Sequence, residues 1–176
     1  SNVRGYEFGT DQTTQSNLVV ELDTYHKAPG DGLSNNFSEL ATCLRAAGYD
    51  VRENDSEITV PGLEAVDVLV LSDYTKLYSA TEIQAIRDFY EAGGGIFIGG
   101  ASVNGPDSGS ALRDLLSAYE VSVANTITGA NAEKIKPHPI TRDVTVLRNM
   151  HGAAPITGGT PLAAAGDRVL AVRKEN

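Results

Sequence analysis

The side chains best suited to chemistry in this sequence are a serine and two histidines. Ser102 lies in the glycine-rich segment 99–105 after an apolar run, where a serine at a strand-to-helix turn can be exposed for nucleophilic attack. A serine nucleophile needs a base within hydrogen-bond reach, and His138 and His151 are the candidates. A serine-dependent hydrolase is the function that these catalytic candidates would serve. The alternative is that Ser102 caps a turn, since Asn104 replaces the last glycine of the Gly-x-Ser-x-Gly pattern.

An acid and an imidazole follow the first apolar run, residues 18–22. Asp23 and His26 are candidate metal ligands, because carboxylate and imidazole groups both bind divalent ions, and Asp31 and Asp73 could add oxygen ligands. The sequence has no His-x-x-x-His or Cys-x-x-Cys spacing. The alternative is therefore that Asp23 accepts hydrogen bonds from loop backbone and that His26 lies on the surface.

Two prolines, Pro137 and Pro139, flank His138 and favour an extended, rigid backbone around it. A histidine held in this way could act as a ligand or a base. It could equally donate a structural hydrogen bond that holds the long C-terminal connection against the sheet edge.

Strand-like and helix-like patterns alternate along the chain. The apolar runs predict strands at residues 18–22, 49–53, 66–71, 96–98, 121–123, 144–147 and 169–172, and helices at 37–47, from Ser79 to Gly93, and at 110–119. Ser34 or Asn36 is the expected N-cap of the first helix, Gly48 its C′ residue, and Ser79 with Glu82 a capping box. This alternation predicts an α/β fold with a doubly wound, mostly parallel sheet.

In such sheets, ligands bind beyond the carboxyl ends of the strands, at the topological switch point. Aromatic rings there could stack on a sugar or contact a protein, and a helix N-terminus after residues 99–105 could bind an anion. The segment lacks the Gly-x-Gly-x-x-Gly order and a Walker lysine, so we expect no nucleotide cofactor. The predicted ligand-binding residues are Asp23, Tyr25, His26, Asp73, Tyr74, Gly100, Ser102, Asn104 and His138, with Tyr78 near the same end.

Several motifs occur in the order and spacing of a known superfamily. They are Phe37-Ser-Glu-Leu-Ala with Leu44-Arg-Ala-Ala-Gly-Tyr, Asp67-Val-Leu-Val-Leu, residues 82–89, Gly93-Gly-Gly-Ile-Phe-Ile-Gly-Gly, and His138-Pro-Ile-Thr. Residues 18–150 thereby resemble the class I glutamine amidotransferase-like superfamily, and more narrowly its non-catalytic branch of intraflagellar-transport-type, gliding-type and trehalose-utilisation-like domains. The resemblance implies a three-layer flavodoxin-like sandwich.

The resemblance also bears on catalysis. Catalytic members of the superfamily carry a nucleophilic cysteine at the turn after the fourth strand, whereas residues 99–105 contain none. The single cysteine, Cys43, is expected on the first helix and cannot take that role. We therefore do not expect amidotransferase chemistry.

Composition narrows the classes of partner. Of 176 residues, 14 are Lys or Arg and 23 are Asp or Glu, and the net charge of −9 argues against nucleic acid and anionic membranes. No apolar stretch approaches the ~18 residues that span a bilayer. Residues 1–17 are predicted to be a flexible lead-in, and residues 18–176 one domain, compatible with excision from a longer protein. Compartment and oligomeric state stay open, with extracellular and cytoplasmic locations both compatible.

The leading hypothesis is a non-catalytic amidotransferase-like domain that binds a protein partner or a small polar ligand at the carboxyl ends of the strands. One alternative is a hydrolase that uses Ser102 with His138 or His151. Another, from the resemblance alone, is a carbohydrate-binding or carbohydrate-processing domain.

Overall fold

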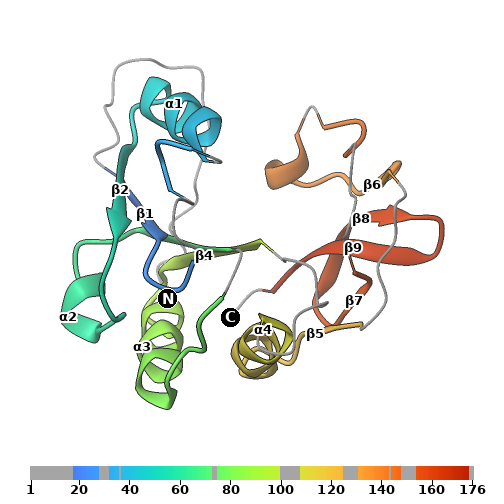
Figure 1. The fold of residues 1–176 in the computed structure, drawn as a ribbon. Coiled ribbons are helices and arrows are strands. Elements are labelled where there is room, and N and C mark those ends of the chain that lie inside the picture. Colours follow the sequence, from blue (N-terminus) through green and yellow to red (C-terminus); the bar gives the residue numbers. More distant parts are fainter. Residues whose placement is uncertain are drawn as a thin grey trace.

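The computed structural model describes residues 18–27, 32–35, 37–72, 75–99, 108–124, 131–142, 144–147 and 154–174. The predicted lead-in, residues 1–17, lies outside these ranges. The largest sheet has four strands: β1 (Val19–Asp23), β2 (Asp50–Asn54), β3 (Val68–Ser72) and β4 (Gly95–Gly99) (Figure 1). Their order is β2-β1-β3-β4, and every pairing is parallel.

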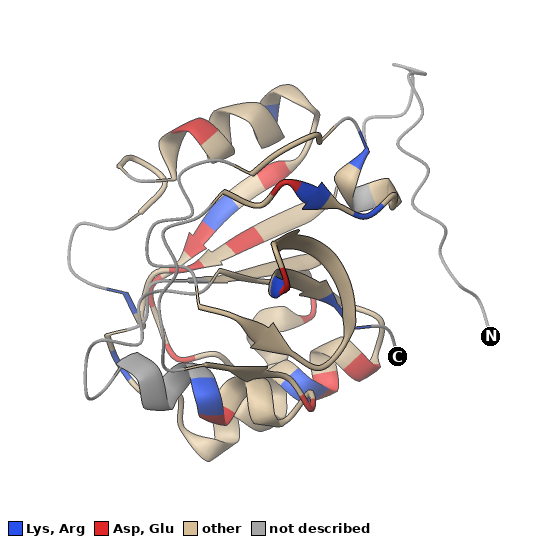
Figure 2. Cartoon of the chain, turned by 90° about the vertical axis from the view of Figure 1, so that its right-hand side faces the viewer, with Lys and Arg blue, Asp and Glu red and all other residues tan. Residues whose placement is uncertain are grey.

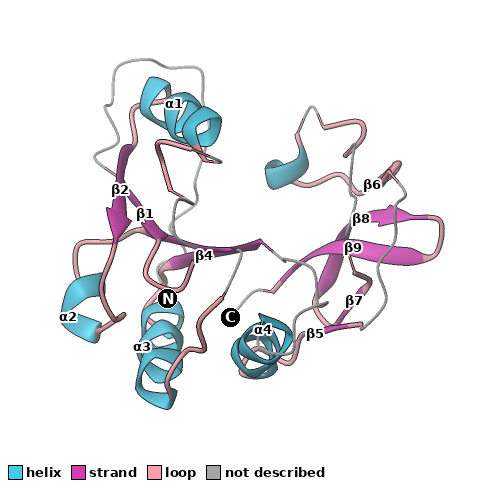
Figure 3. Ribbon diagram, in the orientation of Figure 1, coloured by secondary structure: helices cyan, strands magenta, loops and turns pink. Residues whose placement is uncertain are grey.

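Helices cover both faces of this sheet. Figure 3 shows α1 (Ser38–Ala46) on one side, and α2 (Val60–Leu63), α3 (Ala80–Glu91) and α4 (Ser108–Ser117) on the other. The apolar clusters follow this division: Val20, Leu22, Ala41, Val51 and Val70 lie on the α1 side. Leu69, Leu71, Ile86 and Leu115 are fully buried on the α3 side. The predicted α/β sandwich with a parallel sheet is confirmed.

The C-terminal part of the chain is built differently. From residue 122 onward the strands pair antiparallel: β5 (Ser122–Val123) with β7 (Ile156–Thr157), and β8 (Thr160–Ala165) with both β6 (Lys134–Ile135) and β9 (Arg168–Arg173). A 3-10 turn, η1 (Pro139–Thr141), follows β6. The strand predicted at 144–147 is wrong, because the segment forms only one bridge, between Leu147 and Ala132.

The helix ends test the capping predictions. The Ser79–Glu82 capping box is present, and Gly48 follows α1 with a φ of +90°, a conformation that suits glycine. The predicted N-cap of α1 is wrong: Phe37 occupies that position, and no side chain caps the helix. Phe37 instead packs against the apolar cluster under α1, so packing rather than capping sets this helix start.

Two further features concern possible partners. Among the described residues, no helix is long and apolar enough to cross a membrane. Figure 2 shows acidic and basic residues interspersed over the helices, strands and loops of the chain.

Candidate functional site

The candidate site lies at the carboxyl ends of β1 and β3. After β1 the chain forms β2 on one side of β1 and then β3 on its other side. The carboxyl ends of β1 and β3 are therefore the topological switch point of the sheet. The loops that follow the two strands carry Asp23 to Lys27 and Thr75 to Tyr78. Sequence reasoning placed the site here, and the structure shows what occupies it.

Asp23, the last residue of β1, organises the first loop. Its side chain is 1% exposed, and Oδ1 accepts hydrogen bonds from the backbone N–H of Tyr25 (3.1 Å) and His26 (3.4 Å). Aspartate after a strand commonly bonds to backbone two or three residues later and reverses the chain. Its Oδ2 accepts the Tyr78 hydroxyl at 2.8 Å and lies 2.8 Å from His26 Nδ1. The predicted loop-bonding role of Asp23 is confirmed.

His26 lies at the centre of this cluster. Its side chain is 0% exposed, so the surface position considered for it is wrong. The ring stacks on Tyr78, with centroids 3.9 Å apart and an interplanar angle of 27°, and Tyr25 meets it edge-on at 5.1 Å. On the far side, Nε2 lies 3.2 Å from Glu82 Oε1. That contact has ion-pair distance but lacks the alignment of a good hydrogen bond.

Glu82 completes the cluster from the first turn of α3. Its Oε2 accepts the Ser79 N–H at 2.9 Å, and Oε1 accepts the Ile58 N–H at 3.1 Å. Burial raises the pKa of Glu82, but the hydrogen bonds from Ser79 and Ile58 and the electrostatic effect of the nearby His26 together bring the pKa below its ordinary value. Sequence reasoning identified Glu82 only as a capping residue, because nothing local to α3 shows that His26 lies opposite.

The His26 backbone also joins the two loops. Its carbonyl accepts the N–H of Thr75 at 2.8 Å, the N–H of Lys76 at 3.2 Å and the Thr75 hydroxyl at 3.3 Å. We call Asp23, His26, Tyr78 and Glu82 the crevice cluster. Among the described residues, these side chains fill the space between the ends of β1 and β3, and the two loops are bonded together through the His26 carbonyl.

Outside the crevice cluster, the same loops and the segment between β2 and α2, which carries Glu57, present an exposed surface. The Lys76 ammonium lies 3.3 Å from the centre of the Tyr25 ring, a cation–π contact. The Tyr25 hydroxyl donates to Glu57 Oε1 at 3.5 Å, and Leu77 is 51% exposed. We call Tyr25, Glu57, Lys76 and Leu77 the loop surface.

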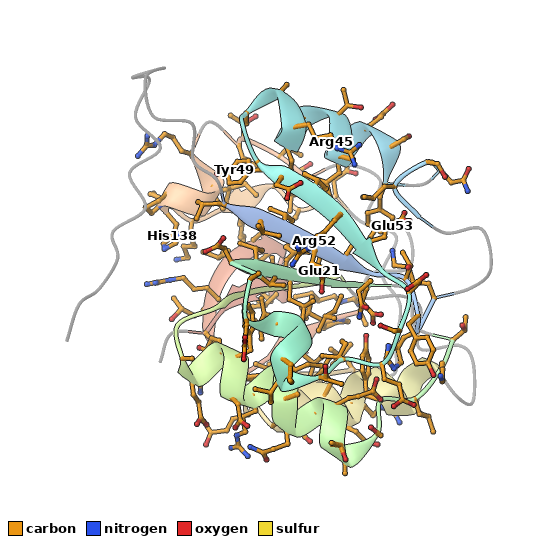
Figure 4. All side chains as sticks on the ribbon, turned by 90° about the vertical axis from the view of Figure 1, so that its left-hand side faces the viewer. Glu21, Arg45, Tyr49, Arg52, Glu53 and His138 are labelled. Carbon is orange, nitrogen blue, oxygen red and sulfur yellow. The ribbon has the colours of Figure 1, made fainter. Side chains whose placement is uncertain are left out.

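The structure describes the positions of only some of the predicted site residues. Asp23, Tyr25 and His26 lie together, with Tyr78 from the second loop. The segment around His138 was expected near the same crevice, but Figure 4 shows His138 on the side of Tyr49, which precedes β2, and away from Glu53 near the carboxyl end of that strand. The reason is that His138 follows β6, which pairs within the C-terminal sheet. The remaining candidates lie outside the described residues: Asp31, Asp73, Tyr74, Gly100, Ser102, Asn104 and His151.

Asp23 and His26 were predicted as candidate metal ligands. In the part of the chain that the structure describes, no group of three His, Cys, Asp or Glu side chains could hold an ion. Both oxygens of Asp23 already accept hydrogen bonds, and His26 Nδ1 faces one of them. Asp23 and His26 are therefore placed to bond to each other and to the protein.

A second charged pair lies on the sheet itself, shown in Figure 4. Glu21, 7% exposed on β1, accepts a 2.9 Å hydrogen bond from Arg52 Nε on β2. Arg45, from α1, donates to the Val51 carbonyl of the same edge strand at 2.8 Å. These contacts stabilise β2 and satisfy a carbonyl of a sheet edge, which makes that edge less available for pairing with another chain.

Comparison with known proteins adds to this description. No protein-family model matches the chain, and no curated protein matches it. Among solved structures the chain is similar to one described as "mmIFT52 N-terminal domain", with a TM-score of 0.68 and 14% sequence identity. The match covers 88% of this chain and 76% of that one. At this identity it shows a shared fold, consistent with the intraflagellar-transport-type part of the resemblance, while the amidotransferase-like superfamily stays a prediction.

Proposed function

We propose that this chain is a non-catalytic α/β domain that binds a protein partner through the loop surface. The observation that carries the proposal is the crevice cluster. Asp23, His26 and Glu82 are 1%, 0% and 4% exposed, and His26 is hydrogen-bonded to Asp23 and within ion-pair distance of Glu82, so these side chains fill the space between the ends of β1 and β3. The outer side of the same loops is then the part of this site that a partner can reach.

The composition of the loop surface supports a protein rather than a small ligand. Tyr25 and Leu77 combine an aromatic ring and an exposed aliphatic side chain, and Lys76 and Glu57 place one charge of each sign beside them. Aromatic anchors with a polar rim are typical of protein interfaces. Likeness in fold to a domain named as the N-terminal part of IFT52 supports a role within a larger protein.

Site-specific photo-cross-linking tests this proposal. A photoreactive phenylalanine analogue is placed at Leu77 or, as a control, at Val60 on α2; the two side chains are 51% and 52% exposed. In source-cell extract we expect one discrete cross-linked protein from position 77, not from position 60, and its loss when Tyr25→Ser is added. Equal cross-linking from both positions would contradict the assignment of the loop surface.

A catalytic assay tests the non-catalytic part of the proposal. Hydrolysis of simple aryl esters and amides by the chain, abolished in Ser102→Ala, would show a serine hydrolase and overturn the proposal. We expect no turnover above that of the Ser102→Ala variant. The described residues hold no observation that favours hydrolysis or carbohydrate binding over protein binding.

A further inference from the structure

We propose that the crevice between the carboxyl ends of β1 and β3 is a cation-binding site, and that its resident cation is the imidazolium of His26. The chain would thus supply, as a side chain, the small planar cation for which the site is built. This inference concerns the crevice cluster alone and does not depend on the loop surface or on any partner.

The geometry around the ring carries the argument. His26 Nδ1 lies 2.8 Å from Asp23 Oδ2, and Nε2 lies 3.2 Å from Glu82 Oε1. A neutral imidazole has one N–H and one nitrogen lone pair, whereas the imidazolium has two N–H groups. In the neutral ring, the unprotonated nitrogen would lie beside a carboxylate oxygen, at 2.8 or 3.2 Å. The doubly protonated ring donates from Nδ1 to Asp23, and its Nε2–H lies within ion-pair distance of Glu82 without the alignment of a hydrogen bond.

Hydrogen-bond donors surround both carboxyl groups, as they do ionised carboxylates. Asp23 accepts two backbone N–H groups on Oδ1 and the Tyr78 hydroxyl on Oδ2. Glu82 accepts one backbone N–H on each oxygen, from Ser79 and Ile58. Donors directed at both oxygens favour the ionised form. The lowered pKa of Glu82 agrees with this assignment.

The surroundings suit a buried cation. The ring is 0% exposed, and a charge so buried requires opposite charge close by, which Asp23 and Glu82 supply. The face of Tyr78 stacks on the ring, and an aromatic face attracts a cation. The nearby ammonium groups lie over other rings, Lys27 at 3.4 Å from the Phe37 centre and Lys76 at 3.3 Å from the Tyr25 centre.

If the site is built for a cation, removing the imidazole should leave a pocket for a free one. In His26→Gly the space would be lined by Asp23, Tyr78 and Glu82, which hold two carboxylates and an aromatic face. The ligand class is a small planar organic cation, and the probe is imidazole itself at about pH 6, where the free base is largely protonated.

Thermal unfolding of the whole chain measures this binding. We expect imidazole to raise the melting temperature of His26→Gly saturably, by about 5 °C, and to leave the wild-type chain unchanged. Pyrazole, with the same ring size but no charge, is the matched control and should give no shift. Equal stabilisation by pyrazole would show a simple cavity and overturn the proposal.

A second measurement does not require His26→Gly to fold. The chain has 3 histidines, so the double variant His138→Gln/His151→Gln leaves His26 as the only one. Nitrogen-15 NMR of its imidazole at neutral pH should show two protonated ring nitrogens. One protonated and one unprotonated nitrogen would overturn the proposal, and either result leaves the partner-binding experiments unaffected.

Discussion

Two polar networks in this molecule contain the same kinds of groups in opposite surroundings. The crevice cluster holds a histidine, two carboxylates and a tyrosine, all buried. Near the C-terminus, Lys174 pairs with Glu120 at 2.8 Å, and its carbonyl accepts the Tyr90 hydroxyl at 3.1 Å. There the Lys174 and Glu120 side chains are 37% and 84% exposed.

This difference indicates that burial, rather than the type of contact, determines how much each network contributes to the stability of the fold. Water screens the exposed pair, and such pairs contribute little to stability. In the crevice cluster, a group that loses its partner is left without water as a substitute. Tyr119, which meets Tyr90 edge-on, is partly buried, and burial raises the pKa of its hydroxyl to about 12.

Of the substitutions considered, Asp23→Asn is expected to lower the free energy of unfolding the most. The substitution keeps the shape of the side chain but replaces the charged carboxylate with a neutral amide. That carboxylate faces His26 and accepts a hydrogen bond from the Tyr78 hydroxyl. We expect a loss of about 3–5 kcal/mol in the free energy of unfolding, measured by urea denaturation. A loss below 1 kcal/mol would show that the crevice cluster is no more important than a surface pair.

Glu82→Gln is expected to cost less, about 2 kcal/mol, because the amide oxygen can still accept one backbone hydrogen bond. The pH dependence distinguishes charge from shape. Since the folded pKa of Glu82 is below its ordinary value of 4.5, its carboxylate stabilises the fold above pH 4.5. This contribution is lost as the pH falls through the folded pKa. Acid denaturation curves of wild type should show the loss, and those of Glu82→Gln should be flatter.

Two tyrosine-to-phenylalanine variants form a matched pair. Tyr78→Phe removes a buried hydroxyl that donates to Asp23, and we expect a cost of about 1–2 kcal/mol. Tyr90→Phe removes a hydroxyl that donates to an exposed backbone carbonyl, that of Lys174, and water can replace it. Urea denaturation should therefore rank Tyr78→Phe well above Tyr90→Phe, and equal costs would remove the distinction between the networks.

The smallest effect is expected for Glu120→Gln. The Lys174 ammonium lowers the pKa of Glu120, but the carboxylate is in open solvent, where salt screens the pair. The melting temperature should be unchanged within error at physiological salt. A clear decrease would show that this pair holds the end of β9 in place.

Local signals explain which parts of the fold could be predicted. The apolar runs of β1 and β3 and the Ser79–Glu82 capping box act over a few residues, and the structure contains all three. The C-terminal strands β6, β7 and β8 were not predicted, since they are short or rich in alanine and carry no clear period. Their pairing is determined by contacts between distant segments.

The candidate site divides in the same way. The sequence alone places Asp23 and His26 three residues apart after a strand, which made them candidates, and aspartate after a strand bonds to the following backbone. Only the tertiary structure brings in Tyr78, which is 55 residues from Asp23, and Glu82 on a separate helix. The physical reason is that parallel pairing brings the carboxyl ends of β1 and β3 to one sheet edge, where the loop after β3 and the start of α3 enclose His26.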